Sequence, residues 1–481
     1  MSIAFDSAHG LAKKIRGKEI SSRELTDLYI GRIERYDDDI NAVVVRDFDR
    51  GRAAADAADA ALARGEALGP LHGVPMTIKE AYDIEGLHTT WGIPAFKSNV
   101  ASSDAESVAR FKAAGAHFIG KTNVPVQLSD FQSYNEIYGT TNNPWNLERI
   151  PGGSSGGSSA ALAAGFCALE AGSDIGGSIR NPAHFCGVYG HKPTWNIVPQ
   201  RGHSLPGMYA DPDIAVVGPL ARSAEDLALA LDLTSGPGAL VERGWKLELP
   251  PPRRKSLSEF RVVLWPDEGI APVSREVADR VQSVGEKLAA LGATVSDRAR
   301  PAIDPGQSHS VYQYMLQGAM SAGIPDQPFA GMQAYAATLD PSDQSDGATV
   351  VRATVQTHRE WVRQNNQRTR LRMAWQEFFQ EWDLVICPQS PRAAFPHDHS
   401  EITQRTLEVD GVAQPYFQQL FWAGLVTVAY LPSTVFPTGP SAEGLPIGLQ
   451  AFSGEYEDRT CIEFARLIEK EIGGFVPPPG Y

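Results

Sequence analysis

Apolar positions near the start of the chain repeat with a helical period. Residues 25–36, LTDLYIGRIERY, follow a serine and a glutamate that stand three positions apart, Ser21 and Glu24, which is the spacing of a capping box. The alanine-rich residues 54–65, AADAADAALARG, predict a second helix. These patterns predict that the N-terminal residues 1–65 are helical.

Short apolar runs bounded by glycine and proline follow, and they predict buried strands. The first two are GVPMTIKEAYDIEG at residues 73–86 and HFIGKTNVP at residues 117–125. Helical stretches such as ESVARFKAAG alternate with them. Later runs of the same kind are FRVVLWP at 260–266, DLVICP at 383–388 and LPIGLQAF at 445–452. The alternation predicts an α/β protein.

Two further segments decide the domain organisation. Residues 301–382 are more polar and mostly helical in pattern, and residues 247–257, LELPPPRRKSL, are rich in proline. The proline-rich segment is either a domain boundary or a loop, and strand-like runs occur on both of its sides. We therefore predict a single domain over residues 1–481, with residues 300–382 as a helical insertion or cover. Two domains are the alternative.

Composition and charge narrow the class of partner. The chain has 481 residues, 42% of them apolar and 21% charged, which is typical of a soluble globular protein. Its 57 acidic residues outnumber 43 basic ones, which gives a formal net charge of −14. Because phosphate binding needs a basic face, this charge disfavours nucleic acid and anionic membranes as main partners.

The cysteines and the N-terminus bear on the compartment. The cysteines form no CxxC pair and predict neither a disulfide framework nor a zinc site; they are Cys167, Cys186, Cys387 and Cys461. The N-terminus lacks a basic segment followed by an apolar run, and no stretch approaches the roughly 20 apolar residues that cross a bilayer. We therefore expect a cytoplasmic protein without a signal peptide or a membrane span.

The segment with the most unusual composition is PGGSSGGSSAALAAGFCALEAGSDIGGSIRNPA, residues 151–183. GGSSGGSS alone resembles a flexible linker, but an apolar, helix-like stretch follows it directly. A phosphate-binding loop is disfavoured, because no lysine lies between Lys121 and Lys192 and the GxGxxG fingerprint is absent. The remaining interpretation is nucleophilic catalysis by serine.

A serine nucleophile needs a base that takes its proton. The GxSxG elbow is missing around Ser178, and no histidine lies in a comparable setting, so a base other than histidine is expected. A lysine can serve, because burial brings its pKa from about 10.4 toward neutrality. Lys79 is the candidate, since it ends the apolar run VPMTIK, although most lysines considered singly are solvated surface charges.

These motifs resemble those of the amidase signature family. GGSSGGS followed by GSDIGGSIRNPA is similar to its signature, and GVPMTIKE is similar to its lysine motif, with 75 residues from Lys79 to Ser154 and 24 from Ser154 to Ser178. The resemblance extends through GKTNVP, GTTNNPW, GVYGHKPT, VGPLARSAEDLALAL and GLPIGLQ, and weakens between residues 232 and 382. It implies the family's fold, a mixed central β-sheet covered by helices on both faces.

The resemblance also assigns roles to matching positions. It implies that Ser178 is the acyl-forming nucleophile and that Ser154, which follows a cis peptide bond from Gly153, links it to the base Lys79. Backbone N–H groups would form the oxyanion hole, from Ile175, Gly176, Gly177 and Ser178. Hydrogen bonds from three further residues would support the site, namely Ser155, Asp174 and Arg180.

The implied reaction is hydrolysis of a small-molecule carboxylic amide through an acyl-enzyme, without a metal or an organic cofactor. RGHSLPG, FPHDH and PYFQQLFWAGLVTVAYLPSTVFPTG resemble the bacterial amidases of the 6-aminohexanoate cyclic-dimer hydrolase and aryl acylamidase type. This similarity implies hydrophobic or aryl amides, and also esters or carbamates, as substrates. A homodimer is a family expectation.

Two other functions stay open. A glutaminase subunit of a tRNA-dependent amidotransferase would use the same three residues, but this chain has Tyr209-Ala210-Asp211-Pro212 where that branch has Ser-Leu-Asp. A non-catalytic binding protein is disfavoured, because all three catalytic positions are filled. Four histidines show no metal-ligand spacing, namely His191, His203, His397 and His399, and Cys186 is expected to pack in the core. Four aromatic residues are expected in the core, with the lining of an acyl or amine pocket as the alternative; they are Phe131, Tyr134, Trp145 and Trp422.

Overall fold

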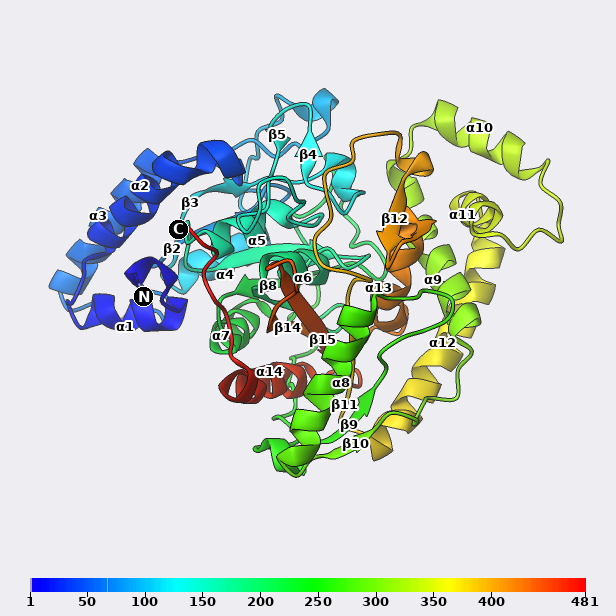
Figure 1. Ribbon diagram of the computed structural model, residues 1–481. Coiled ribbons are helices and arrows are strands. Elements are labelled where there is room, and N and C mark those ends of the chain that lie inside the picture. The colour runs from blue at the N-terminus through cyan, green and yellow to red at the C-terminus, as the bar shows by residue number, and fades with distance from the viewer. Residues whose placement is uncertain (1, 67) are drawn as a thin grey trace.

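Helices and strands alternate along the chain, as the hydrophobic pattern predicts (Figure 1). The computed structural model describes residues 2–66 and 68–481. Its helices are α1 (Ala8–Arg16), α2 (Ser22–Ile40), α3 (Phe48–Ala63), α4 (Glu106–Ala113), α5 (Gly156–Ala163), α6 (Arg180–Cys186), α7 (Ala224–Thr234), α8 (Arg275–Ala290), α9 (Pro305–Met320), α10 (Asp326–Ala336), α11 (Asp346–Thr354), α12 (His358–Glu381), α13 (Leu420–Thr427) and α14 (Asp458–Ile472). Its strands are β1 (Val43–Arg46), β2 (Pro75–Lys79), β3 (His117–Thr122), β4 (Tyr134–Asn135), β5 (Gly139–Thr140), β6 (Glu170–Asp174), β7 (Tyr189–Lys192), β8 (Val216–Ala221), β9 (Arg261–Leu264), β10 (Thr294–Ser296), β11 (Leu384–Pro388), β12 (Thr406–Val409), β13 (Val412–Pro415), β14 (Ser433–Pro440) and β15 (Pro446–Phe452).

The N-terminal helices agree with the sequence pattern, with one correction. Helix α2 begins at the predicted capping box, in which the Ser21 hydroxyl accepts from the Glu24 N–H and the Glu24 side chain accepts from the Ser21 N–H. Residues 1–65 are not helical throughout, because β1 separates α2 from α3. Its three consecutive valines are β-branched and favour an extended backbone, and the strand pairs antiparallel with β3.

Eight strands in the described part of the chain form one mixed sheet, in the order β10-β9-β11-β15-β14-β7-β8-β6. The strands β10, β9 and β11 run parallel to one another, and the other neighbours run antiparallel. A smaller sheet has the order β1-β3-β2, and its strand β2 contacts β6 at the edge of the large sheet. The ends of β2 and β6 are therefore neighbours, although the sequence places them about 90 residues apart.

Helices cover both faces of the large sheet, which confirms the predicted architecture. Successive side chains of a strand point to opposite faces, and β14 shows what each face contacts. Phe436 packs edge-on against Phe464 of α14, with ring centroids 5.7 Å apart. The next residue back, Val435, lies on the other face beside Gly448 and close to His184 of α6.

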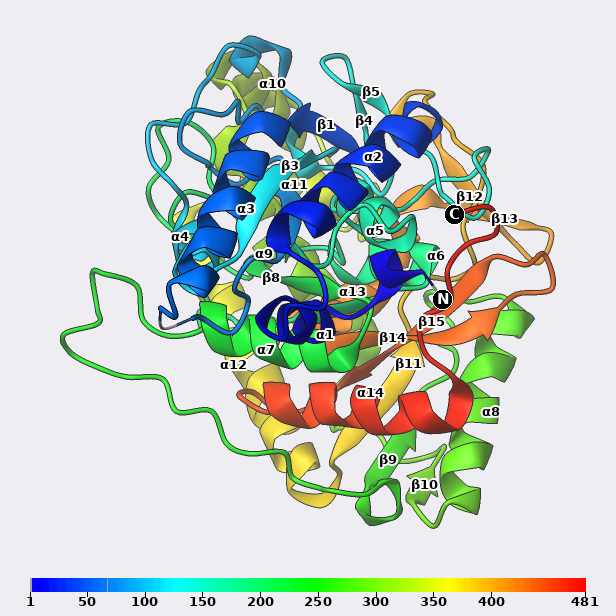
Figure 2. The same ribbon diagram turned by 90° about the vertical axis from the view of Figure 1, so that its left-hand side faces the viewer.

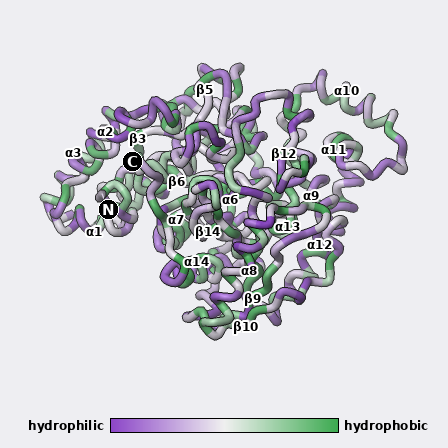
Figure 3. The backbone as a smooth tube through the Cα atoms, viewed as in Figure 1, coloured by the Kyte–Doolittle hydropathy of each residue, from purple (hydrophilic) through white to green (hydrophobic). Residues whose placement is uncertain are grey.

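The predicted helical segment at residues 300–382 consists of α9, α10, α11 and α12, on the right of Figure 1. Trp375 of α12 anchors it on the large sheet through an edge-on contact with Phe452 of β15, at 5.3 Å between ring centroids. Tyr312 of α9 is fully buried in the same apolar cluster. The outer helix α10 buries no residue, and the hydrophilic colour of Figure 3 is strong around it. These helices therefore form a cover that contacts the large sheet through α9 and α12, while α10 lies outside.

The proline-rich segment, apart from Leu257 at its end, lies in a long surface connection, residues 235–256, which forms no helix or strand among its described residues (Figure 2). Arg253 binds Glu457 at 2.8 Å and Arg254 binds Asp383 at 3.0 Å. The strands β8 and β9 on either side of the connection belong to the same sheet. A single domain over residues 1–481 stays a prediction.

Within residues 2–66 and 68–481, no helix combines the length and the apolar character needed to cross a membrane.

Candidate active site

Lys79 lies at the end of β2, where this strand reaches the edge of the large sheet. Its side chain is fully buried, and Nζ donates to the hydroxyl oxygens of Ser154 at 2.7 Å, Ser155 at 3.0 Å and Ser173 at 3.0 Å. The strand is apolar and buried along its length, so it carries the lysine into the interior. The solvated surface charge that most lysines form is thereby ruled out for Lys79.

Burial lowers the pKa of Lys79 from 10.5 to about 7, against the opposing effect of the carboxylates of Asp174 and Glu170. The side chain therefore loses its proton near neutral pH. A neutral amine has two N–H groups and one lone pair. Lys79 can then donate to Ser155 and Ser173 and accept the proton of the Ser154 hydroxyl.

Ser154 and Ser155 follow a cis peptide bond between Gly153 and Ser154, as the family resemblance implies. Glycine is required at position 153, because a Cβ there would lie 2.3 Å from the carbonyl oxygen of Asp130. The N–H of Ser155 donates to the carbonyl oxygen of Ser178 at 3.1 Å. This bond connects the segment of Ser154 directly to the turn that carries Ser178.

The turn between β6 and α6 is organised by a buried ion pair of Asp174 and Arg180, at 2.9 Å. The Asp174 carboxylate also accepts from the backbone N–H groups of Gly177 at 2.9 Å and Ile179 at 3.1 Å. Burial by itself raises the pKa of Asp174, but the charge and hydrogen bonds of Arg180 outweigh it and lower this pKa to about 2. Gly177 has a φ of 102°, which favours glycine. The ion pair thus fixes the backbone on both sides of Ser178.

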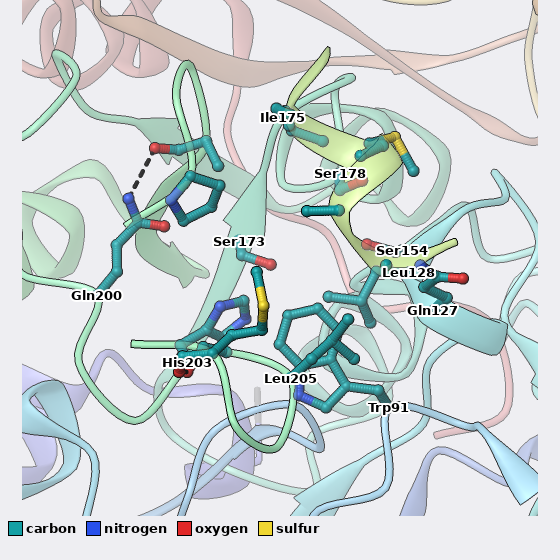
Figure 4. A pocket seen from close by; sticks show the side chains of 18 of the residues that line it. Trp91, Gln127, Leu128, Ser154, Ser173, Ile175, Ser178, Gln200, His203 and Leu205 are labelled. Carbon is teal, nitrogen blue, oxygen red and sulfur yellow. Dashed lines mark hydrogen bonds between the residues drawn. The ribbon is translucent and has the colours of Figure 1, made fainter. Parts of the chain in front are cut away.

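Two cavities meet at Ser178. We call the first, of about 130 Å³, the relay chamber; Ser154, Ser173 and Ser178 line it, together with Trp91 and Leu205. We call the second, of about 370 Å³, the cover chamber; its lining includes Phe131, Gly176, Ser178, Leu316 of α9 and Leu420 of α13. In Figure 4, Ser178 and Ile175 lie on one side of the relay chamber, and Trp91, His203 and Leu205 lie on the other. A substrate at Ser178 therefore has room on two sides.

A sequence model of the family described as Amidase matches residues 24–462. The chain belongs to the amidase family. The match contains every residue of the site described above. Membership supports an enzyme that hydrolyses amide carbon–nitrogen bonds, as the sequence predicts.

Relatives and solved structures agree with amidase family membership. Fatty-acid amide hydrolase 2-A of Danio rerio is 32% identical over 506 residues, which cover 98% of this chain and 90% of the relative. A glutamyl-tRNA(Gln) amidotransferase subunit of Moorella thermoacetica is 32% identical over 500 residues, 98% of this chain and 97% of the relative. A structure of 6-aminohexanoate cyclic dimer hydrolase with substrate shares 26% identity and a TM-score of 0.80 over 99% of each chain. A bacterial aryl acylamidase has the same fold, with a TM-score of 0.82 and 24% identity over 99% of each chain.

The structure brings together the residues that the amidase family resemblance singles out. Lys79 bonds to Ser154 and Ser155, Asp174 pairs with Arg180, and Ser178 lines a cavity with Ser154. The N–H of Gly177 is expected in the oxyanion hole, but in the structure it donates to the carboxylate of Asp174.

Sequence reasoning missed two residues of the site. Ser173 was missed, although it precedes Asp174 in the signature segment, and so was Tyr312, whose hydroxyl donates to the carbonyl oxygen of Ile175 at 3.0 Å. His203 lines the relay chamber, and Phe131 both packs in the apolar core and lines the cover chamber, which is the alternative given for it. Trp422 is fully buried, as expected.

Proposed function

We propose that this protein hydrolyses carboxylic amides through an acyl-enzyme on Ser178, with Ser154 and Lys79 as its proton relay. One observation carries the proposal: a fully buried lysine lies 2.7 Å from the hydroxyl of Ser154, which lines the same chamber as Ser178. A lysine poised to lose its proton, next to a hydroxyl in a cavity, is the arrangement that activates a serine nucleophile.

In the proposed reaction, neutral Lys79 takes the proton of Ser154 while Ser154 takes that of Ser178. The Ser178 oxygen attacks the amide carbonyl, and the proton returns along the same path to the departing nitrogen. Water then repeats the sequence on the ester of Ser178 and releases the acid. Each proton transfer thus runs between the relay side chains and the substrate or the attacking water.

The oxyanion would be stabilised by backbone N–H groups of the turn that Asp174 and Arg180 hold. We assign this role to Ile175, Gly176 and Ser178, since the N–H of Gly177 donates to Asp174. Removing one such donor in other enzymes costs about 2.7–4 kcal/mol in the transition state. Ser155 would hold the neutral Lys79 in place by accepting one of its N–H groups.

The linings of both chambers favour uncharged, hydrophobic or aryl amides as the substrate class. Neither chamber has a lysine or an arginine among its described lining residues. A substrate with a free carboxylate, such as glutamine, would therefore lack a counter-ion, which disfavours the glutaminase alternative. Esters and carbamates offer a carbonyl to the same nucleophile. A homodimer and a cytoplasmic location stay predictions.

A panel of 4-nitroanilides and 4-nitrophenyl esters that differ in acyl group tests the proposal. We expect turnover of the hydrophobic members, labelling of Ser178 by a fluorophosphonate, and loss of both in Ser178→Ala with the fold intact. Absence of turnover together with absence of labelling at Ser178 would overturn the proposal. Glutaminase activity that needs a partner protein would instead revive the amidotransferase alternative.

A further inference from the structure

One wall of the relay chamber contains three residues in an unfavourable backbone conformation. Trp91, Gln127 and Leu128 have φ angles of 55°, 54° and 57°, and all three line this chamber. The left-handed region costs free energy for any residue with a Cβ, and such residues cluster where a site needs them. The wall is therefore held in its shape by the structure around it.

Hydrogen bonds beneath the wall hold Trp91 in place. The N–H of Gln127 donates to the carbonyl oxygen of Trp91 at 2.8 Å. The fully buried carboxylate of Glu80, the residue after Lys79, accepts from the N–H groups of Thr90 at 2.6 Å and Trp91 at 2.9 Å. Trp91 is thereby held by the residue that directly follows β2, the strand that carries Lys79.

The size and chemistry of the relay chamber restrict what it can hold. Its volume of about 130 Å³ suits a single ring, since an apolar cavity of about 150 Å³ holds benzene. Trp91 and His203 form an aromatic wall, with ring centroids 5.1 Å apart. Burial and the charges of Lys79 and Lys121 lower the pKa of His203 to about 3, so its ring is neutral. The only carboxylate in the described lining is Asp174, which Arg180 already neutralises.

The position of Ser154 decides which half of the substrate enters this chamber. In the proposed reaction, Ser154 passes the proton to the departing nitrogen, so this nitrogen must lie near Ser154. Ser154 lines the relay chamber, whereas the cover chamber reaches Ser178 from the side of Gly176 and Leu316. The amine half therefore belongs in the relay chamber and the acyl half in the cover chamber.

We propose that Trp91 is the specificity-determining residue for the amine half of the substrate, and that it selects uncharged amines with a single flat ring. Glu80 is the positioning residue that holds Trp91. The inference rests on the proposed amide hydrolysis and deepens it, because it assigns the two halves of the substrate to the two chambers.

The test compares amides that share one acyl group and differ in the amine. The measured quantity is the amine ratio, which is the kcat/KM of the anilide divided by the kcat/KM of the cyclohexylamide. Each variant's amine ratio is then divided by that of wild type, because this cancels the different intrinsic reactivities of the two amides. Trp91→Leu removes the flat ring and should lower the ratio about tenfold, while Trp91→Phe keeps the ring and should stay within about threefold of wild type. Glu80→Gln should lower the ratio in the same direction by a smaller factor.

The deacylation step provides an internal control. The amine has left before water attacks the acyl-enzyme, so Trp91→Leu should leave the deacylation rate constant within about twofold of wild type. Leu316→Ala in the cover chamber is the matched variant. It should change the preference among acyl groups on a common 4-nitroaniline and leave the anilide-to-cyclohexylamide ratio unchanged.

The inference would be overturned by an unchanged amine ratio in Trp91→Leu, or by a deacylation rate constant that changes as much as the acylation rate constant does. Wild-type enzyme tests it without any variant. After each kcat/KM is divided by the rate constant of uncatalysed alkaline hydrolysis, which cancels intrinsic reactivity, amides of 4-aminobenzoate and of 2-naphthylamine should lie at least about tenfold below the anilide. Equal values for the three amides would contradict the assignment of the amine half to the relay chamber. Failure of the proposed function would give a different result, because the fluorophosphonate would then not label Ser178 even in the wild-type enzyme.

Discussion

Lys79 and Lys192 are two lysines that are equally buried but lie in different surroundings. Both side chains are fully buried, and burial lowers the pKa of each to about 7. Lys79 contacts three serine hydroxyls, whereas Lys192 donates to the backbone carbonyl oxygens of Pro193 and Leu431, both at 2.8 Å. A hydroxyl can release a proton and a carbonyl cannot. A lowered pKa therefore does not identify a base; the groups that contact the lysine do.

The largest effect is expected from Lys79→Met, which removes the base and keeps an unbranched apolar side chain in its place. We expect kcat/KM for a 4-nitroanilide to fall at least about 10³-fold, in the range found for the loss of general base catalysis. The free energy of unfolding should also fall, by about 1–3 kcal/mol, because three buried serine hydroxyls lose the amine that they contact, so kcat/KM is compared per folded molecule. A fall of less than tenfold would show that Lys79 is not the base.

Asp174→Asn affects both lysines, because the Asp174 charge raises the pKa of Lys79 and of Lys192. The variant also leaves Arg180 as a buried charge without its partner. Removing one member of a buried pair costs about 3–5 kcal/mol, so we expect a loss of that size in the free energy of unfolding by urea. The midpoint of the pH–activity curve should move to lower pH in the folded fraction. Unchanged stability would show that other groups neutralise Arg180.

Lys192→Met is the matched control for Lys79→Met. It removes the donor from two buried carbonyl oxygens, and an unsatisfied buried polar group costs about 1–3 kcal/mol. The free energy of unfolding should fall by about this amount, while kcat per folded molecule stays within about threefold of wild type. If Lys192→Met abolished turnover without unfolding the protein, the distinction between the two lysines would be lost.

The smallest effect is expected from Ser173→Ala, which removes one of three hydroxyl partners of Lys79. A single hydrogen bond contributes about 1 kcal/mol, so kcat/KM should fall by less than about tenfold. The pH midpoint should move down, since the ammonium form loses an acceptor. Ser173→Thr keeps a hydroxyl and should restore both values. A loss as large as that of Lys79→Met would make Ser173 part of the relay.

The relay itself could be predicted from the sequence because its parts are local motifs. Lys79 ends a short apolar run, and Ser154 and Ser178 lie in one glycine-rich segment, but it is the resemblance of these motifs to the amidase signature family that assigns their roles. Helix α2 could be predicted from its helical periodicity, and strands β9, β11 and β15 from their short apolar runs, because these patterns are also local.

The chambers could not be predicted, because they form between segments that are far apart in the sequence. Leu316 reaches the site from the helical cover, and Trp91 becomes a wall only through its contacts with Glu80 and Gln127. No local pattern encodes such contacts. The strand β1 was missed because its four residues are fewer than a periodicity needs to become visible.

The most direct test of the account is the rate constant for phosphonylation of Ser178 by a fluorophosphonate, in which fluoride leaves, measured against pH. Protonated Lys79 cannot accept the relayed proton, so the rate should fall below its pKa of about 7 and level off above it. Lys79→Met should abolish this dependence and lower the plateau, and Lys192→Met should leave both unchanged. A rate for wild type that stays flat from acid to alkaline pH would contradict the claim that Lys79 is the base.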